Sequence, residues 1–285
     1  MLVAVALFAL MDTGLKILSP HYPALQVATL RGAAALPLVL AWSLATIGAR
    51  GLLRVHWPLH LLRGVLGVAL MAGFVYGVRL LPLTTAYAIS FVAPLLVTAM
   101  AVPILGEKVG PRRWAAIFVG LVGVLVVLRP TGQGMMTLGG LAILGAAVCY
   151  AASAITVRVL AQRDSTQAMV FWLMVMLVIG GGALSWHEWA PIQGRHWWVI
   201  AGIGLVGTLA QVALTEAFRR GEASMIAPLE YTALVWGVLL DLTLWQVLPD
   251  GVTWLGAGII VASGLYLIRR ERVRNAEHIE PVEHP

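Results

Sequence analysis

Long apolar runs fill this chain, and short charged or Pro/Gly-rich connections separate them. Each run is close to the roughly 20 residues that a helix needs to cross the hydrocarbon core of a bilayer. Breaking the chain at these connections predicts ten spanning helices, at about residues 1–18, 24–46, 58–79, 83–105, 112–129, 138–160, 166–185, 196–217, 223–246 and 252–268. The pattern therefore predicts an all-α integral membrane protein, and no connection is long enough to hold a soluble domain.

The run from Leu80 to Arg113 shows this pattern most clearly. It carries no charged side chain before Glu107, and Pro94 interrupts it near its middle. A basic cluster that begins at Lys108 follows at once. We expect a spanning helix that is broken near the proline and is held at the cytoplasmic face by its basic end.

Composition supports a membrane protein and excludes other classes. The chain of 285 residues is 60% hydrophobic and 11% charged, which is more apolar surface than a soluble domain of this size could bury. The net charge of +6 does not indicate nucleic acid binding, because the basic residues lie between apolar runs and not on one face. Cys149 is the only cysteine, so we expect neither an intramolecular disulfide nor a thiolate metal site.

Motifs of common enzyme and metal-protein classes are missing. The sequence has no Walker loop and no G-x-S-x-G, and His187-Glu188 does not continue as HExxH. His56 and His60 have helical metal-ligand spacing, but they stand beside Trp57 at an expected interface, so we interpret them as a solvated pair. We predict no catalytic residue, metal or cofactor.

The distribution of basic residues predicts orientation. With the N-terminus inside, the cytoplasmic connections and the tail hold about fourteen Lys and Arg residues, including Arg63, and the opposite face holds four. Positive residues favour the cytoplasmic side, so both termini are expected there. We read the apolar run that begins at Met1 as the first spanning helix and not as a cleaved signal, because it has no basic region before it.

An internal repeat is visible at an offset of 140 residues. The matching pairs are Gly64 and Gly204, Gly67 and Gly207, Arg79 and Arg219, Phe91 and Tyr231, Trp114 and Trp254, and Arg129 and Arg269. Each copy would contain five helices. Because an odd number of spans ends on the opposite side of the membrane, the second copy must be inverted relative to the first. We predict one repeat at 1–130, an inverted repeat at 138–268 and a cytoplasmic tail at 269–285. Such repeats are typical of transporters with a site near the bilayer midplane.

Several of these stretches resemble the drug/metabolite transporter superfamily, in its EamA-type branch of ten-helix proteins. The residues that carry the resemblance are Phe8 to Lys16, Tyr22-Pro23 with Gln26 and Arg31, Pro82 to Ala86, Ser90 to Pro94, Leu105 to Lys108, Ala227 to Tyr231, Pro249-Asp250 and Trp254 to Gly256. The chain looks most like members that import S-adenosylmethionine or riboflavin, or that export amino acids and other metabolites. It departs from many members at Gln246-Val247, where they have a Gly-Glu pair.

Ionisable residues inside a bilayer are costly, so each is a functional candidate. In the first half, Asp12 and Lys16 stand four residues apart on one helix face, in the order that favours an intrahelical pair. They contact a substrate or ion, or they only neutralise each other. Arg31 has no acid nearby in sequence; it binds a carboxylate or phosphate-like group, or it pairs with another helix.

In the second half, Gln211, Glu230 and Asp241 lie within predicted helices, and Glu216 is expected in an interfacial ion pair. Glu230 is the strongest candidate for a charged cavity residue, because Pro228 just before it frees backbone groups that can also face a cavity. Both Glu230 and Asp241 are candidates for proton coupling.

Aromatic residues on the same helices could stack on a flat or cationic substrate, or could simply pack or face lipid. These residues are Tyr76, Tyr87, Phe91, Trp172, Tyr231 and Trp236.

These patterns favour a secondary transporter of a small organic metabolite in a cell inner membrane. We expect alternating access around a cavity lined by the first four helices and the sixth to ninth. The fifth and tenth would pack or form a homodimer contact. The rival hypothesis is an integral-membrane enzyme that acts on a lipid-linked substrate. The expected partners are the metabolite and the lipid bilayer, not nucleic acid.

Overall fold

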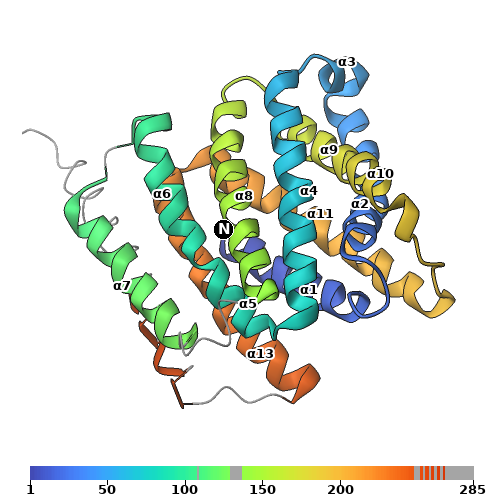
Figure 1. Ribbon diagram of the computed structural model, residues 1–285. Coiled ribbons are helices and arrows are strands. Elements are labelled where there is room, and N and C mark those ends of the chain that lie inside the picture. The colour runs from blue at the N-terminus through green and yellow to red at the C-terminus, as the bar shows by residue number, and fades with distance from the viewer. Residues whose placement is uncertain are drawn as a thin grey trace, which may run out of the picture.

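The computed structural model describes residues 1–107, 109–128, 137–246, 251–252, 254–256, 258–259, 262–263 and 266. Within these ranges every regular element is a helix, and no strand occurs (Figure 1). The first half contains α1 Leu2–Leu18, α2 Ala24–Thr46, α3 Gly48–Leu53, α4 Trp57–Leu80, α5 Leu83–Ser90, α6 Val92–Leu105 and α7 Pro111–Leu128. The second half contains α8 Leu138–Leu160, α9 Thr166–Met176, η1 Leu177–Gly181, α10 Gly182–Ser185, η2 Trp186–Glu188, η3 Gly194–His196, α11 Trp197–Arg220, α12 Ala223–Ile226, η4 Ala227–Thr232 and α13 Ala233–Trp245.

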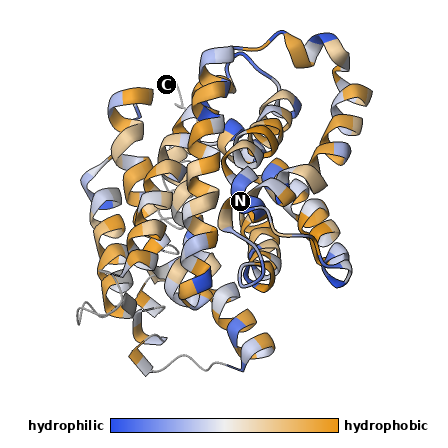
Figure 2. Ribbon diagram, turned by 45° about the vertical axis from the view of Figure 1, so that its right-hand side comes forward, coloured by the Kyte–Doolittle hydropathy of each residue, from blue (hydrophilic) through white to orange (hydrophobic). Residues whose placement is uncertain are grey.

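Six helical stretches of the described chain are long and apolar enough to cross a membrane. They are Ala24–Thr46, Trp57–Leu80, Leu83–Leu105, Leu138–Leu160, Thr166–Glu188 and Gly194–Arg220. Many large apolar side chains are also exposed on the outer surface. Hydrophobic residues colour most of the helical ribbon in Figure 2. The protein is therefore a multi-pass membrane protein. Ten spans stay a prediction, since about half of 252–268 and the whole tail lie outside the described residues.

The break expected at Pro94 lies one turn earlier, at Phe91, between α5 and α6. Proline lacks the N–H that would bond the carbonyl four residues before it, so the interruption falls on its N-terminal side. The second half has its own interruption at η4, a 3₁₀ segment over Ala227–Thr232. Phe91 and Tyr231, which are related by the 140-residue offset, thus both stand in discontinuous backbone.

Helices from the two halves pack against each other throughout the core. α1 lies along α11, α4 along α8, and α2 against both α9 and α11, whereas α7 lies beside α5 and α6 at the edge of the bundle (Figure 1). Small residues permit the closest approaches. A Cβ atom added to Gly204 on α11 would lie 2.6 Å from the Cβ of Ala34 on α2 and 2.8 Å from its carbonyl oxygen. The contact between these two helices therefore requires glycine.

Candidate functional site

A cavity of about 190 Å³ lies between the helices of the two halves. Residues of α1, α2, α4, α5, α6, α8, α9, η1, α11, η4 and α13 line it, and no described residue of α7 does. These elements correspond to the first four and the sixth to ninth predicted helices, which were expected to line a cavity. Most lining side chains are apolar. The polar lining residues are Asp12, Arg31, Arg63, Tyr87, Ser90, Tyr150, Ser153, Gln211, Thr215 and Glu230.

Asp12 of α1 faces this cavity and accepts a hydrogen bond from Tyr87 of α5. The phenol oxygen lies 2.8 Å from Oδ2 of the carboxylate, and both side chains are buried. The predicted intrahelical pair with Lys16 is wrong. Lys16 instead points to α13, where its Nζ lies 3.3 Å from Oδ1 of Asp241. Shared helical spacing made the Asp12–Lys16 pair possible, but tertiary contacts gave each side chain a different partner.

Lys16 and Asp241 form a separate polar cluster that does not line the cavity. Oδ2 of Asp241 accepts a bond from the backbone N–H of Thr84 at 3.0 Å and a second from the Thr84 hydroxyl. The Lys16 ammonium lies 4.5 Å from the ring centre of Trp245, a cation–π contact. One buried carboxylate thus joins α1 and α5 of the first half to α13 of the second.

Arg31 of α2 reaches across the cavity to the second half. Its Nη2 donates to Oε1 of Gln211 on α11 at 3.2 Å, and its Nη1 lies 3.6 Å from the sulfur of Met71. Its Nε has no partner although it is buried, and the guanidinium lies 5.8 Å from the ring centre of Phe8. Among the described residues, Arg31 forms no ion pair with a carboxylate, so it is held by neutral groups.

Glu230 lies in η4 and lines the cavity, as predicted. Its Oε1 accepts a hydrogen bond from the phenol of Tyr150 on α8 at 2.7 Å. Phe91 also lines the cavity and meets the ring of Tyr231 edge-on, at 5.3 Å between ring centres. The two interrupted backbone segments thus bring an acid and an aromatic ring to one wall.

Four of the predicted substrate contacts lie away from this cavity. They are Lys16, Tyr76, Trp172 and Tyr231. Tyr76 is 39% exposed on the outer face of α4. Trp172 donates its indole N–H to the carbonyl of Leu52 at 2.8 Å. Tyr231 is buried behind Phe91. Trp172 and Tyr231 fill packing positions between helices, which is the alternative that the sequence left open for aromatic residues. Trp236 is 37% exposed and does not line this cavity.

The sequence analysis missed several polar lining residues, among them Arg63, Tyr150 and Thr215. Arg63 was assigned to a cytoplasmic connection, but it is only 2% exposed and its Nη1 donates to the carbonyl of Met169 at 2.6 Å. A signal was available, because Arg63 stands inside the apolar segment predicted at 58–79 and not before it. Nothing in the sequence alone distinguished Tyr150 or Thr215 from other polar residues in apolar helices.

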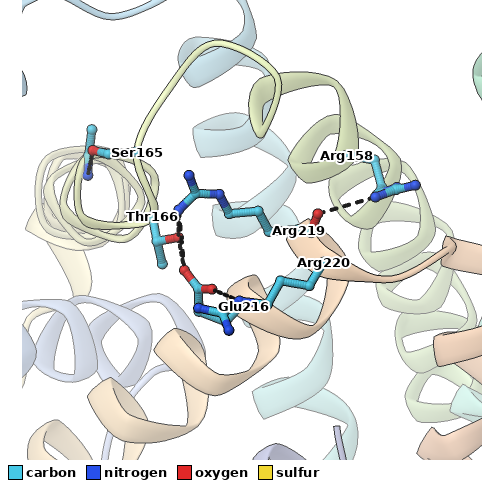
Figure 3. A network of polar contacts seen from close by, with 7 residues as sticks. Arg158, Ser165, Thr166, Glu216, Arg219 and Arg220 are labelled. Carbon is cyan, nitrogen blue, oxygen red and sulfur yellow. Dashed lines mark hydrogen bonds and ion pairs between the residues drawn. The ribbon is translucent and has the colours of Figure 1, made fainter.

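A polar network ties together the ends of α8, α9 and α11 (Figure 3). Glu216 binds Arg220 at 2.7 Å and Arg219 at 3.4 Å, which confirms the predicted ion pair, and it also accepts a hydrogen bond from Thr166. Arg158 donates to the carbonyl of Arg219 at 3.2 Å. These contacts join α8, α9 and α11 at one end of the bundle.

The prediction of a solvated histidine pair is wrong for His60. This side chain is buried, and its Nε2 lies 2.8 Å from Oδ2 of Asp164. The backbone N–H of His56 donates to the same oxygen at 3.1 Å. Within the described residues, no group of three or more His, Cys, Asp or Glu side chains is placed to hold a metal ion.

Comparison with known proteins gives consistent results. Residues 1–129 and 137–269 each match the EamA-like transporter family. The chain is 30% identical over 279 residues to a riboflavin transporter of Vibrio cholerae, covering 95% of this chain and 92% of that protein. It is 26% identical to the pseudopaline exporter CntI of Pseudomonas aeruginosa, covering 93% of each chain. It is 28% identical over 213 residues to an S-adenosylmethionine uptake transporter of Rickettsia felis, covering 75% of this chain and 72% of that one.

A crystal structure with 21% sequence identity shares the fold. It superimposes with a TM-score of 0.74 over 95% of this chain and 97% of the other.

Proposed function

Because the chain belongs to the EamA-like transporter family, we propose that it is a secondary-active transporter that moves a small organic metabolite by alternating access. One observation carries the proposal: the cavity takes its polar groups from both halves of the chain. Asp12 and Arg31 come from the first half, and Gln211 and Glu230 come from the second. A rocking motion of one half against the other would therefore expose the same groups to either side in turn.

The two halves, 1–130 and 138–268, are proposed to be inverted repeats of five helices. The family matches the chain twice, over nearly these ranges. The helix interruptions also correspond. Moreover, Gly106 and Gln246, which are related by the same offset, end α6 and α13 in the same left-handed conformation, with φ of 68° and 54°.

The orientation proposed for the protein places both termini in the cytoplasm of a bacterial cell, with the helices in the inner membrane. The excess of basic residues on the connections supports this orientation, and the excess remains when the buried Arg63 is left out of the count. The relatives named above are bacterial. The polar network around Glu216 then lies at the cytoplasmic end of the cavity.

Substrate contact is proposed for the six predicted residues that line the cavity. They are Asp12, Arg31, Tyr87, Phe91, Gln211 and Glu230. Proton coupling is proposed for Glu230 and Asp241. A proton on Asp241 would remove the charge that attracts Lys16, and this would weaken a contact between the two halves. Such a contact can link proton uptake to the movement of α1 relative to α13.

The test is flux into proteoliposomes that contain the purified chain, measured over a panel of labelled metabolites. We expect saturable flux for at least one of them. The variant Glu230→Gln should insert normally but carry at least tenfold less flux, because Glu230 is a partly buried carboxylate that lines the cavity. Glu188→Gln, at an exposed position, is the matched control. Turnover of a lipid-linked substrate without saturable flux would contradict the proposal.

A further inference from the structure

Arg63 is a buried cation without a counterion. Among the described residues it forms no ion pair; one N–H bond goes to the carbonyl of Met169, and its buried Nε has no partner. The side chain nevertheless lines the cavity. An unpaired buried charge is strongly unfavourable, so such a group normally has a partner or receives one from a ligand.

Thr215 lines the same cavity and carries a second unused donor. Buried threonines in these helices commonly bond the carbonyl four residues earlier, as Thr98 and Thr156 do at 2.9 and 2.8 Å. The hydroxyl of Thr215 makes no such bond and has no other partner among the described residues, although the residue is only 1% exposed. It therefore has a hydrogen bond still to make beside the cavity.

Arg63 and Thr215 stand at the same end of the cavity. Arg63 bonds Met169 in the first turn of α9, and Thr166, three residues earlier, bonds Glu216, which follows Thr215 in the chain. Each residue also lies at a similar depth. Arg63 is six residues from the start of α4, or about 9 Å, and Thr215 is five residues from the end of α11, or about 8 Å.

The other charged groups of the cavity already have partners. Asp12 accepts from Tyr87, Glu230 accepts from Tyr150, and Arg31 donates to Gln211. His60, three residues before Arg63, is bonded to Asp164. Arg31 keeps one unused N–H at its Nε, whereas Arg63 and Thr215 together place two unused donors at one end of the cavity, where a ligand would have to supply the acceptors.

We propose that Arg63 and Thr215 form an anion subsite that holds a carboxylate of the transported metabolite, an inference that rests on the proposed function. A guanidinium presents paired N–H donors that match the two oxygens of a carboxylate. A singly charged carboxylate balances the single charge of Arg63, whereas a phosphate monoester would bring about −1.5 to −2 charges into a mostly apolar cavity. The remaining lining accepts an apolar body, so the substrate class is a small organic acid.

The first test measures binding to the purified full chain in detergent by titration calorimetry. The probes are acetate, 3-methylbutanoate and 3-phenylpropionate, each beside its primary amide, together with phenyl phosphate. We expect at least one carboxylate to bind ten times or more tightly than its amide. Equal binding of acid and amide, tighter binding of phenyl phosphate, or no binding by any of the carboxylates would overturn the proposal.

Variants locate the effect. Arg63→Gln should weaken carboxylate binding about 10- to 100-fold, the loss expected for a charge-assisted hydrogen bond, and leave amide binding unchanged. The matched control is Arg54→Gln, which removes an exposed arginine nearby. If Arg63→Gln does not fold, Thr215→Val decides, with Thr208→Val as control because Thr208 bonds the carbonyl of Gly204. Wild-type affinity in the folded test variant would refute the subsite.

Flux separates this inference from the proposed function. If a carboxylate binds through Arg63 but no metabolite crosses the membrane, the transporter proposal fails and the subsite stands. If a neutral or cationic metabolite is transported and Arg63→Gln leaves its flux unchanged, the subsite fails and the transporter proposal stands.

Discussion

The contact between α2 and α11 at Gly204 gives a sharp prediction about how packing positions the cavity. In Gly204→Ala the new methyl would lie 2.6 Å from the Cβ of Ala34, 2.7 Å from its carbonyl carbon and 2.8 Å from its carbonyl oxygen. Two of these atoms are backbone and cannot rotate away. Ordinary carbon contacts need about 3.5–4.0 Å, so the helices must separate by roughly 1 Å.

The magnitude follows from that displacement. Overpacking of this kind costs about 1–3 kcal/mol of stability. Arg31 stands one turn from Ala34, and its partner Gln211 stands two turns from Gly204, so their 3.2 Å hydrogen bond spans the same two helices. A separation of roughly 1 Å stretches this bond beyond hydrogen-bonding distance. We therefore expect lower thermal stability together with weaker substrate binding.

The assay is thermal unfolding of the purified variant in detergent, followed by ligand titration. Gly202→Ala is the control, because a methyl at Gly202 meets no atom within 4 Å. That substitution should be neutral or stabilise by up to about 1 kcal/mol, through helix propensity alone. Equal melting temperatures for the two variants would refute the reasoning.

Three further substitutions test helix ends and proton coupling. Gln246→Gly should raise stability by about 1 kcal/mol in thermal unfolding, because glycine adopts the left-handed conformation of Gln246 without strain. Gly106→Ala should lower stability by a similar amount, because alanine is strained in the left-handed conformation of Gly106 even though its methyl would meet no atom within 4 Å. Asp241→Asn removes the charge that holds Lys16 and should weaken the pH dependence of flux while the protein still inserts; unchanged pH dependence would exclude Asp241 from proton coupling.

Hydrophobic run length made the helices predictable. The bounds of α2 and α8 agree with the predicted segments to the residue, because membrane thickness and backbone hydrogen bonding leave little freedom for where an apolar helix begins and ends. Glu230 was also identified as a cavity residue, since a carboxylate beside a proline in an apolar helix needs polar surroundings, which a cavity provides. A break near Pro94 was expected, but it lies at Phe91, because Pro94 has no N–H to bond the carbonyl four residues before it.

The partners of the charged residues were not predictable. Lys16 bonds Asp241, 225 residues away, and not Asp12 four residues away, because the packing of α1 against α13 decides the contact. Arg63 was wrongly assigned to a cytoplasmic connection, because the positive-inside rule, which concerns connections, was applied to a residue inside a helix. Spacing along one helix shows which side chains share a face, but it does not show which helix that face meets.

The most direct test of the central claim is the accessibility of the cavity from the two sides of the membrane. Ser153 lines the cavity, and Cys149 is the only native cysteine, so Ser153→Cys in a Cys149→Ala background places one reporter thiol there. Labelling with a membrane-impermeant maleimide is compared in right-side-out and inside-out vesicles. Alternating access predicts labelling from both sides, with protection by a transported metabolite. Labelling from one side only, under all conditions, would contradict it.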